Sequence, residues 1–128
     1  MRRVAVTFAL CLVAGGACAR DFTKSARSEQ LTRMGVYSSW TTECQSKLGV
    51  VKIVSKPSHG TLRPTQVTTK IGTSRYNPDR TAQCKGLPTN GFRVDYISDP
   101  GFRGTDQFVI EFNYGHGPDT DHYTVNVQ

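Results

Sequence analysis

Hydrophobic and polar residues alternate along most of this chain after Gly35. The clearest runs are 92–97 (FRVDYI), 108–112 (FVIEF) and 123–127 (YTVNV), in which every second residue is apolar. A period of two is typical of β-strands that bury one face. The pattern predicts three strands that share one core with Trp40. The inward residues of these strands are Phe92, Val94, Tyr96, Phe108, Ile110, Phe112, Tyr123, Val125 and Val127.

Weaker alternation predicts further short strands between glycine- and proline-containing turns. They cover residues 36–40, 48–55, 61–63 and 66–71. No helical period of ten or more residues occurs after Gly35. About seven short strands with turns between them, in roughly 100 residues, are typical of an all-β, immunoglobulin-like β-sandwich.

The first 19 residues have the layout of a secretory signal peptide. Two arginines precede an uncharged apolar run over 4–14, and small residues follow at 17–19. The run is shorter than the ~20 residues that span a bilayer, so we expect a protein that is not membrane-spanning after cleavage. We expect export to the periplasm or the extracellular medium, with lipid attachment at Cys18 as an alternative to plain cleavage.

Residues 20–34 differ from the rest of the expected mature chain. They are polar and carry only Phe22, Leu31 and Met34 as large apolar residues. We expect a polar N-terminal lead, either loose or forming one or two helical turns, before a β-sandwich domain over 35–128.

The cysteines predict one disulfide. Cys11 and Cys18 would leave with the signal peptide, so Cys44 and Cys84 remain. An oxidising compartment favours a bond between them, which closes a loop of about 40 residues and stabilises the domain by about 4 kcal/mol. A redox pair or a metal site would need a CxxC spacing or a nearby histidine, and neither is present.

Two motifs resemble those of bacterial cadherin-like, immunoglobulin-like repeat domains. Residues 96–108 (YISDPGFRGTDQF) contain a Pro-Gly-Phe-x-Gly-x-Asp-x-Phe corner, and residues 57–62 (PSHGTL) contain a Pro-x-His-Gly-x-Leu turn. Residues 76–78 (YNP) are similar to the Tyr-x-Pro element of the same family. The resemblance covers about 50–127 and implies an immunoglobulin-like sandwich.

Five residues of these two motifs are interpreted as structural loop residues. Gly60, Gly101 and Gly104 meet backbone requirements of tight turns. His59 is expected to pack over its turn. Asp106 is expected to accept hydrogen bonds from N–H groups of its own loop.

One cluster carries potential metal ligands. His116, Asp119, Asp121 and His122 could bind a divalent ion, as in a small metal-dependent hydrolase. Their spacing matches neither a closed zinc site nor a calcium loop, and a hairpin loop with solvated charges explains them equally well. We expect no metal and no cofactor. Without a nucleophile elbow or a marked pair of carboxylates, we also expect no enzymatic activity.

Charge is distributed unevenly along the chain. Nine basic residues and one acidic residue lie between Cys44 and Val94, whereas six acidic residues and one basic residue follow. One hypothesis is a basic face for an anionic ligand. The residues that would form it are Lys52, Lys56, Arg63, Lys70 and Arg93. The alternative is that strands of the two halves interleave and opposite charges pair across neighbouring strands.

These patterns predict an exported, non-enzymatic binding or structural module of the bacterial envelope. Its expected partners are an anionic glycan, another envelope polysaccharide or another envelope protein. Nucleic acid is excluded, because the basic residues are not interleaved with aromatic ones. The alternative function is an accessory subunit of a secreted or surface assembly, which would act through an exposed edge strand.

Overall fold

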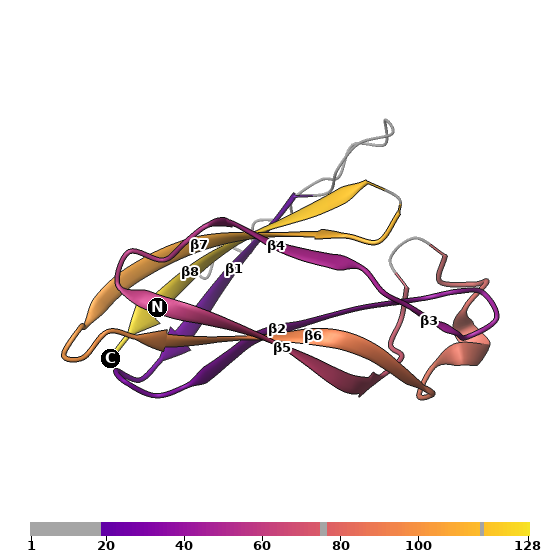
Figure 1. Cartoon of the computed structure of the whole chain (residues 1–128), viewed down its shortest axis with the longest axis horizontal. Coiled ribbons are helices and arrows are strands. Elements are labelled where there is room, and N and C mark those ends of the chain that lie inside the picture. Colours follow the sequence, from indigo (N-terminus) through magenta and orange to yellow (C-terminus); the bar gives the residue numbers. More distant parts are fainter. Residues whose placement is uncertain (1–18, 75–76, 116) are drawn as a thin grey trace, which may run out of the picture.

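The computed structural model describes residues 19–74, 77–115 and 117–128. These residues form two four-stranded β-sheets that face each other in a sandwich (Figure 1). The strands are β1 (Ala19–Ala26), β2 (Thr32–Trp40), β3 (Ser46–Lys47), β4 (Val50–Ser55), β5 (Gly60–Lys70), β6 (Pro88–Ser98), β7 (Gly104–Asn113) and β8 (Pro118–Val127). One turn of 3-10 helix, η1 (Ala82–Cys84), is the only helix in the described ranges. The predicted all-β sandwich is confirmed.

The strand order places β4 and β5 at edges of their sheets. One sheet has the order β1-β8-β7-β4, in which β1 pairs in parallel with β8, and the other has the order β3-β2-β6-β5. The two segments expected at 61–63 and 66–71 are one continuous strand, β5, which runs through Pro64. Proline is tolerated there because an edge strand needs hydrogen bonds on one side only.

The N-terminal segment differs from the expectation of a loose or helical lead over 20–34. Residues 19–26 form β1, and β2 begins at Thr32, so this segment belongs to the sandwich. The Phe22 ring stacks on Tyr123 with centroids 5.0 Å apart, and Ala26 is buried in the core. One large apolar residue, Phe22, is enough to hold this polar strand in the sandwich, because pairing with β8 supplies the main-chain hydrogen bonds. The expected signal segment, residues 1–18 and Cys18 included, lies outside the described residues.

The core contains eight of the ten residues that the alternation predicted. Ala26, Met34 and Tyr37 complete this cluster from β1 and β2. Phe92 and Trp40 are half-buried and do not belong to it, so the prediction is wrong for these two. Phe92 lies beside Gln66 of edge strand β5, which is exposed and leaves the ring partly uncovered. Trp40 ends β2, beyond the closely packed part of the sandwich.

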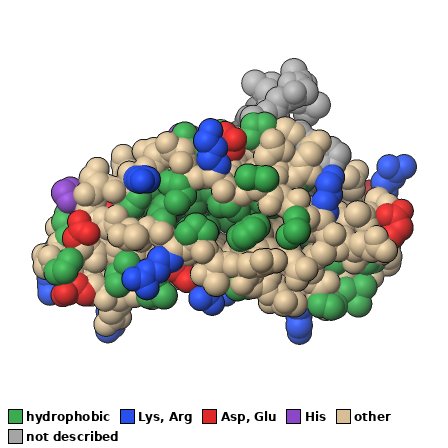
Figure 2. Space-filling view, viewed as in Figure 1, with side chains coloured by type: hydrophobic (Ala, Val, Ile, Leu, Met, Phe, Trp, Pro, Cys, Tyr) green, Lys and Arg blue, Asp and Glu red, His purple; other side chains and the backbone are tan. Residues whose placement is uncertain are grey.

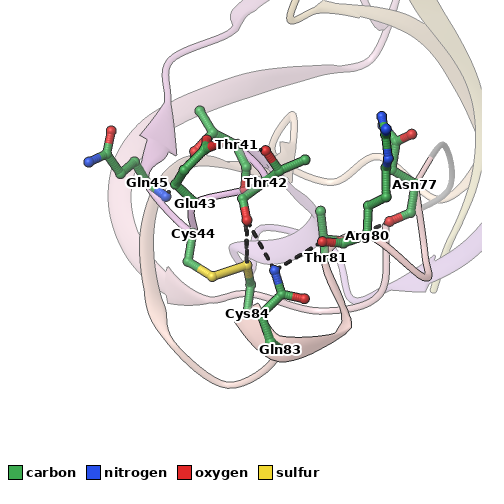
Figure 3. The surroundings of a disulfide bond; sticks show 10 residues. All are labelled: Thr41, Thr42, Glu43, Cys44, Gln45, Asn77, Arg80, Thr81, Gln83 and Cys84. Atoms are coloured by element: carbon green, nitrogen blue, oxygen red, sulfur yellow. Dashed lines mark hydrogen bonds between the residues drawn. A yellow bond between two sulfur atoms is a disulfide. The ribbon is translucent and has the colours of Figure 1, made fainter.

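The disulfide between Cys44 and Cys84 is confirmed. The sulfur atoms are 2.03 Å apart, and the bond joins the turn after β2 to η1 (Figure 3). In the same region the Gln83 amide donates hydrogen bonds to the carbonyl oxygens of Thr42 and Arg80. These links fix the irregular segment between β5 and β6 against the end of β2.

Asp106 lies at the other end of the sandwich and is only 3% exposed. Its carboxylate accepts hydrogen bonds from the backbone N–H groups of Ser58, His59 and Gln107, at 2.9 to 3.1 Å. The Tyr96 hydroxyl donates a fourth, at 2.8 Å. These contacts tie the turn before β5 to the first residues of β7. Only the Gln107 donor belongs to the loop of Asp106 itself, as expected, whereas Ser58 and His59 belong to the turn before β5.

The neighbouring turn residues have the geometry of structural positions. The His59 ring stacks on Phe102 with centroids 4.2 Å apart. Gly101 and Gly104 have φ angles of +74° and +134°, which favour glycine. A Cβ atom at Gly60 would lie 2.5 Å from the Tyr96 ring, so β5 can begin this close to the core only with glycine.

Candidate functional site

A cleft of about 230 Å³ lies between the two sheets, near the disulfide-linked end. The cleft opens at a side of the sandwich where both sheets have little cover. There β1 is the edge of its sheet, and β3 pairs with β2 only at Ser39 and Trp40. The lining residues come from β1, β2, β3, β7 and the loops that follow β5 and β7. They are Arg20, Val36, Tyr37, Ser38, Ser39, Trp40, Lys47, Ser74, Asn77, Phe112 and Tyr114.

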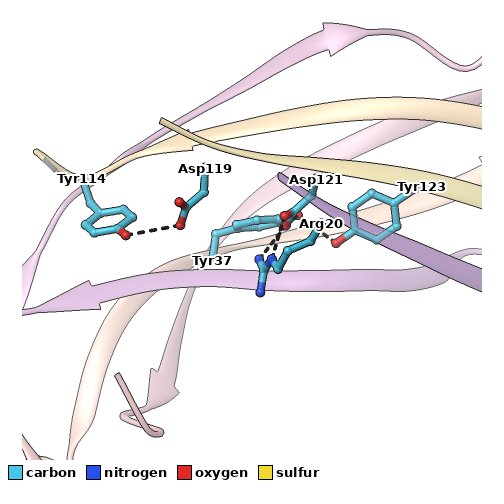
Figure 4. A network of polar contacts seen from close by, with 6 residues as sticks. All are labelled: Arg20, Tyr37, Tyr114, Asp119, Asp121 and Tyr123. Carbon is cyan, nitrogen blue, oxygen red and sulfur yellow. Dashed lines mark hydrogen bonds and ion pairs between the residues drawn. The ribbon is translucent and has the colours of Figure 1, made fainter. Parts of the chain in front are cut away.

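A buried polar network borders this cleft (Figure 4). Asp121 is 1% exposed and accepts two hydrogen bonds from the Arg20 guanidinium, from Nε at 2.8 Å and from Nη2 at 2.7 Å. The Tyr37 hydroxyl donates to Asp121 at 2.7 Å, and the Tyr123 hydroxyl therefore donates to Tyr37, also at 2.7 Å. The carboxylate of β8 thus fixes the side chains that β1 and β2 present to the cleft.

The network holds these groups in fixed protonation states at neutral pH. Burial, reinforced by the neighbouring hydroxyl and by Asp121, raises the pKa of Tyr37. Burial also raises the pKa of Tyr123. For Arg20, burial alone would lower the pKa, but the hydrogen bonds and charge of Asp121 outweigh it and raise the pKa. The phenols therefore stay neutral and the guanidinium stays charged at neutral pH.

A second carboxylate pairs with the tyrosine at the end of β7. The Tyr114 hydroxyl donates to Asp119 at 3.2 Å, and Asp119 is 2% exposed. The Tyr114 ring packs on Phe112 with centroids 5.3 Å apart. Together these contacts hold the half-buried Tyr114 ring in the cleft wall.

The remaining wall combines one aromatic ring, one cation and several hydrogen-bonding groups. The Ser39 hydroxyl donates to the Lys47 carbonyl at 2.9 Å, which fixes the backbone from which the Lys47 side chain extends. The Trp40 Nε1 atom is buried and has no hydrogen-bond partner among the described residues. A buried donor without an acceptor costs free energy.

The structure does not bring the five basic candidates together. Lys52 and Lys56 lie in and after β4, whereas Arg63, Lys70 and Arg93 belong to the opposite sheet. Lys52 stands opposite Glu111 across β4 and β7, and Arg63 stands opposite Asp95 across β5 and β6. Opposite charges from the two halves of the sequence are therefore neighbours, as the interleaving alternative predicts.

The candidate metal ligands also separate. Asp119 and Asp121 are buried on one face of β8, whereas His122 is exposed, because successive residues of a strand point to opposite faces. His116 lies outside the described residues. In the described ranges, no three His, Cys, Asp or Glu side chains are placed to hold a metal ion. The alternative of a hairpin loop with solvated charges is wrong for Asp119 and Asp121, which are inward-facing strand residues.

The sequence alone does not predict most of the cleft. Its pattern places Arg20 in a polar lead and begins the last strand at Tyr123, although β8 starts at Pro118. One signal was present: Asp119 and Asp121 continue the inward period of Tyr123, Val125 and Val127.

Comparison with known proteins assigns no family. No family model matches the sequence, and no curated protein matches it. The solution structure of Amebosin is 11% identical and aligns over 88% of this chain and 100% of that chain, with a TM-score of 0.43. The structure of PbICP-C in complex with falcipain-2 is 12% identical over 93% of this chain and 96% of that chain, with a TM-score of 0.41. At these TM-scores, the two structures assign neither a fold family nor a function to this chain.

In the described ranges, no helix is long and apolar enough to cross a membrane.

Proposed function

We propose that this chain is an exported, non-enzymatic binding module of the bacterial envelope, and that an anionic saccharide occupies the cleft. The composition of the cleft wall carries the proposal. The rings of Trp40 and Tyr114 line it together with hydroxyl and amide groups and two cationic side chains, Arg20 and Lys47. Aromatic faces match the apolar faces of sugar rings, hydroxyls and amides match their oxygens, and the cations match a carboxylate.

The two cations have different roles in this proposal. Arg20 donates two hydrogen bonds to Asp121, and these bonds fix the orientation of its guanidinium. The other N–H groups of the guanidinium are available to a ligand. Lys47 is exposed and makes no ion pair with a described residue. Lys47 is therefore the cation that a ligand carboxylate would engage without competition.

A fluorescence titration tests the proposal, because Trp40 is the one tryptophan of the sequence. A tetrasaccharide of uronic acids should change the Trp40 emission in a saturable way, whereas the neutral tetrasaccharide of the same linkage should bind at least tenfold more weakly. Lys47→Gln should weaken binding of the acidic sugar about tenfold, the loss of roughly 1.4 kcal/mol expected for one charge-assisted contact.

The matched control is Lys56→Gln, which removes the same charge from an exposed lysine outside the cleft. Its affinity should stay within twofold of the wild type. Equal losses in the two variants would contradict a ligand in the cleft. The absence of any saturable change with acidic or neutral sugars would contradict the proposal as a whole and favour a purely structural module.

The immunoglobulin-like, cadherin-like character of the sandwich is part of the same proposal. The orders β2-β6-β5 and β8-β7-β4 match those of strands B-E-D and G-F-C in immunoglobulin-like sandwiches. The Cys44–Cys84 disulfide supports export, because disulfides persist in oxidising compartments.

Edge strand β4 favours a second candidate function, as an accessory subunit of a secreted or surface assembly. Its Val50 and Val54 side chains are 68% and 51% exposed, and Figure 2 shows hydrophobic side chains in a band across the face that carries β4 and β5. An edge strand with exposed apolar residues can pair with another chain. Sedimentation of the wild type should then show concentration-dependent association that Val50→Lys abolishes. A monomer at all concentrations would exclude self-assembly through β4.

A further inference from the structure

The outer face of the β3-β2-β6-β5 sheet carries three arginines around one carboxylate. Asp95 lies on β6, directly opposite Arg33 of β2 on one side and Arg63 of β5 on the other. Arg93, two residues earlier on β6, donates from Nε to Asp95 at 3.0 Å. We call Arg33, Arg63 and Arg93 the arginine row. Arg33 lies outside the predicted basic set, because it belongs to the segment expected to be a polar lead.

The arginine row keeps an excess of positive charge. Asp95 is only 4% exposed, whereas Arg33 and Arg63 are exposed and the Arg93 side chain is 40% exposed. One carboxylate offsets one of three charges. Neighbouring strands lie about 4.8 Å apart, so the backbones of Arg33 and Arg63 stand roughly 10 Å apart with Asp95 between them.

We propose that the arginine row is a second binding surface, separate from the cleft, that takes a linear acidic polysaccharide. Guanidinium groups bind carboxylate or sulfate groups in a bidentate manner, and a row of three spread over three strands matches repeated charges along a chain. Asp95 restrains Arg93 by a hydrogen bond and lies between Arg33 and Arg63 in the strand register.

The neighbouring positions favour a polysaccharide over other polyanions. Thr65 lies opposite Arg93, and Thr61 lies two residues before Arg63 on the same face of β5. Their hydroxyl groups are therefore available for sugar oxygens. The residues paired with or adjacent to the arginine row on the outer face include Thr61, Thr65 and Ile97. No aromatic side chain is among them, whereas single-stranded nucleic acid is usually held by base stacking on aromatic rings. Lys and Arg side chains project from the lower margin in Figure 2, where this sheet lies.

Binding to immobilised polygalacturonate tests the proposal, with neutral dextran as the reference polymer. The double variant Arg33→Gln/Arg63→Gln should lose at least tenfold in affinity and elute at a lower salt concentration. The control Arg80→Gln/Lys85→Gln removes two charges from exposed residues near the disulfide, and its affinity should stay within threefold. All four substituted residues are exposed, so thermal melting should confirm that both variants fold.

Three results would overturn the proposal. The first is an equal loss of affinity in the control variant, which would indicate that net charge alone drives binding. The second is no retention of the wild type on polygalacturonate. The third is tighter binding to single-stranded DNA or to anionic lipid vesicles. The Trp40 emission separates this surface from the cleft, because Trp40 lines the cleft. In Arg33→Gln/Arg63→Gln, the uronic acid tetrasaccharide should still change the Trp40 emission with the affinity of the wild type, so that a failure of the cleft and a failure of the arginine row remain distinguishable.

Discussion

Two buried aspartates at different places in the sandwich have different kinds of partners. Asp106 accepts three hydrogen bonds from backbone N–H groups of the two segments that it joins, and one from the Tyr96 hydroxyl of β6. Asp121 accepts only from side chains in the hydrogen bonds described, and these side chains come from β1 and β2. Both carboxylates are almost fully buried, at 3% and 1% exposure.

The comparison shows that burial of a charged group does not by itself indicate function. Backbone donors are fixed by the fold, so the carboxylate that they surround holds the chain in place. Side-chain donors such as Arg20 and Tyr37 also line the cleft. Under the proposed function, the carboxylate that orients them also shapes the ligand site. The Asp106 corner is structural, and the Asp121 network is the scaffold of the cleft.

Alkaline pH should give the largest effect, because buried tyrosines belong to both regions. Burial raises the pKa of Tyr37, Tyr96 and Tyr123, whereas tyrosines of the unfolded chain ionise near pH 10. Their contribution to stability is thus complete below pH 10 and is lost as the pH rises further. The loss should be about 1.4 kcal/mol per pH unit for each tyrosine that stays protonated.

Urea unfolding between pH 8 and 11.5 measures this loss, and absorbance at 295 nm follows the phenolates. The folded protein should show three tyrosines that do not titrate near pH 10. Titration of all five tyrosines of the sequence near pH 10 in a folded chain would contradict the buried networks in both regions.

Asp106→Asn should give the next largest effect. The amide loses the charge and offers one acceptor oxygen in place of two, so N–H groups at Ser58, His59 or Gln107 lose their partner. We expect a loss of about 3 kcal/mol in the free energy of unfolding, measured by urea denaturation. Affinity for the acidic tetrasaccharide should not change. A large change in affinity, with stability intact, would contradict the distinction between the two regions.

Asp121→Asn should destabilise less, by about 1–2 kcal/mol, because Arg20 is 33% exposed in its side chain and can turn to water. Its effect on ligand affinity should be the greater, since Arg20 and Tyr37 lose their common anchor. Titration calorimetry with the acidic tetrasaccharide measures this change. Asp21→Asn, an exposed neighbour on β1, is the control and should change neither property. Unchanged affinity in Asp121→Asn would show that the network does not serve the cleft.

The core, the Asp106 corner and the disulfide could be predicted from the sequence, because their signals are local. Alternation over 108–112 and 123–127 placed the core side chains, the Pro-Gly-Phe corner placed Asp106, and the isolated pair of cysteines gave the disulfide. Each of these signals depends on residues close in sequence or on a single pairing. Trp40 and Phe92 were misplaced because their burial depends on what the opposite strands contribute.

The cleft could not be predicted, because its residues meet only after folding. Asp121 and Arg20 are 101 residues apart in the chain. In sequence, Asp119 and Asp121 resemble a polar loop, and their burial is favourable only because distant side chains supply donors. Segment 20–26 resembles a lead for the same reason: the strand with which it pairs, β8, lies about 100 residues later in the chain.

Amide chemical-shift mapping tests the central claim most directly, since it observes both regions in one titration. On addition of the uronic acid tetrasaccharide, the shifts should change along β2 from Val36 to Trp40, at Lys47 and around Tyr114. The amides of Ser58, His59 and Gln107 should keep their shifts, because their hydrogen bonds to Asp106 remain. Shift changes at the Asp106 corner, with the cleft residues unaffected, would contradict the account.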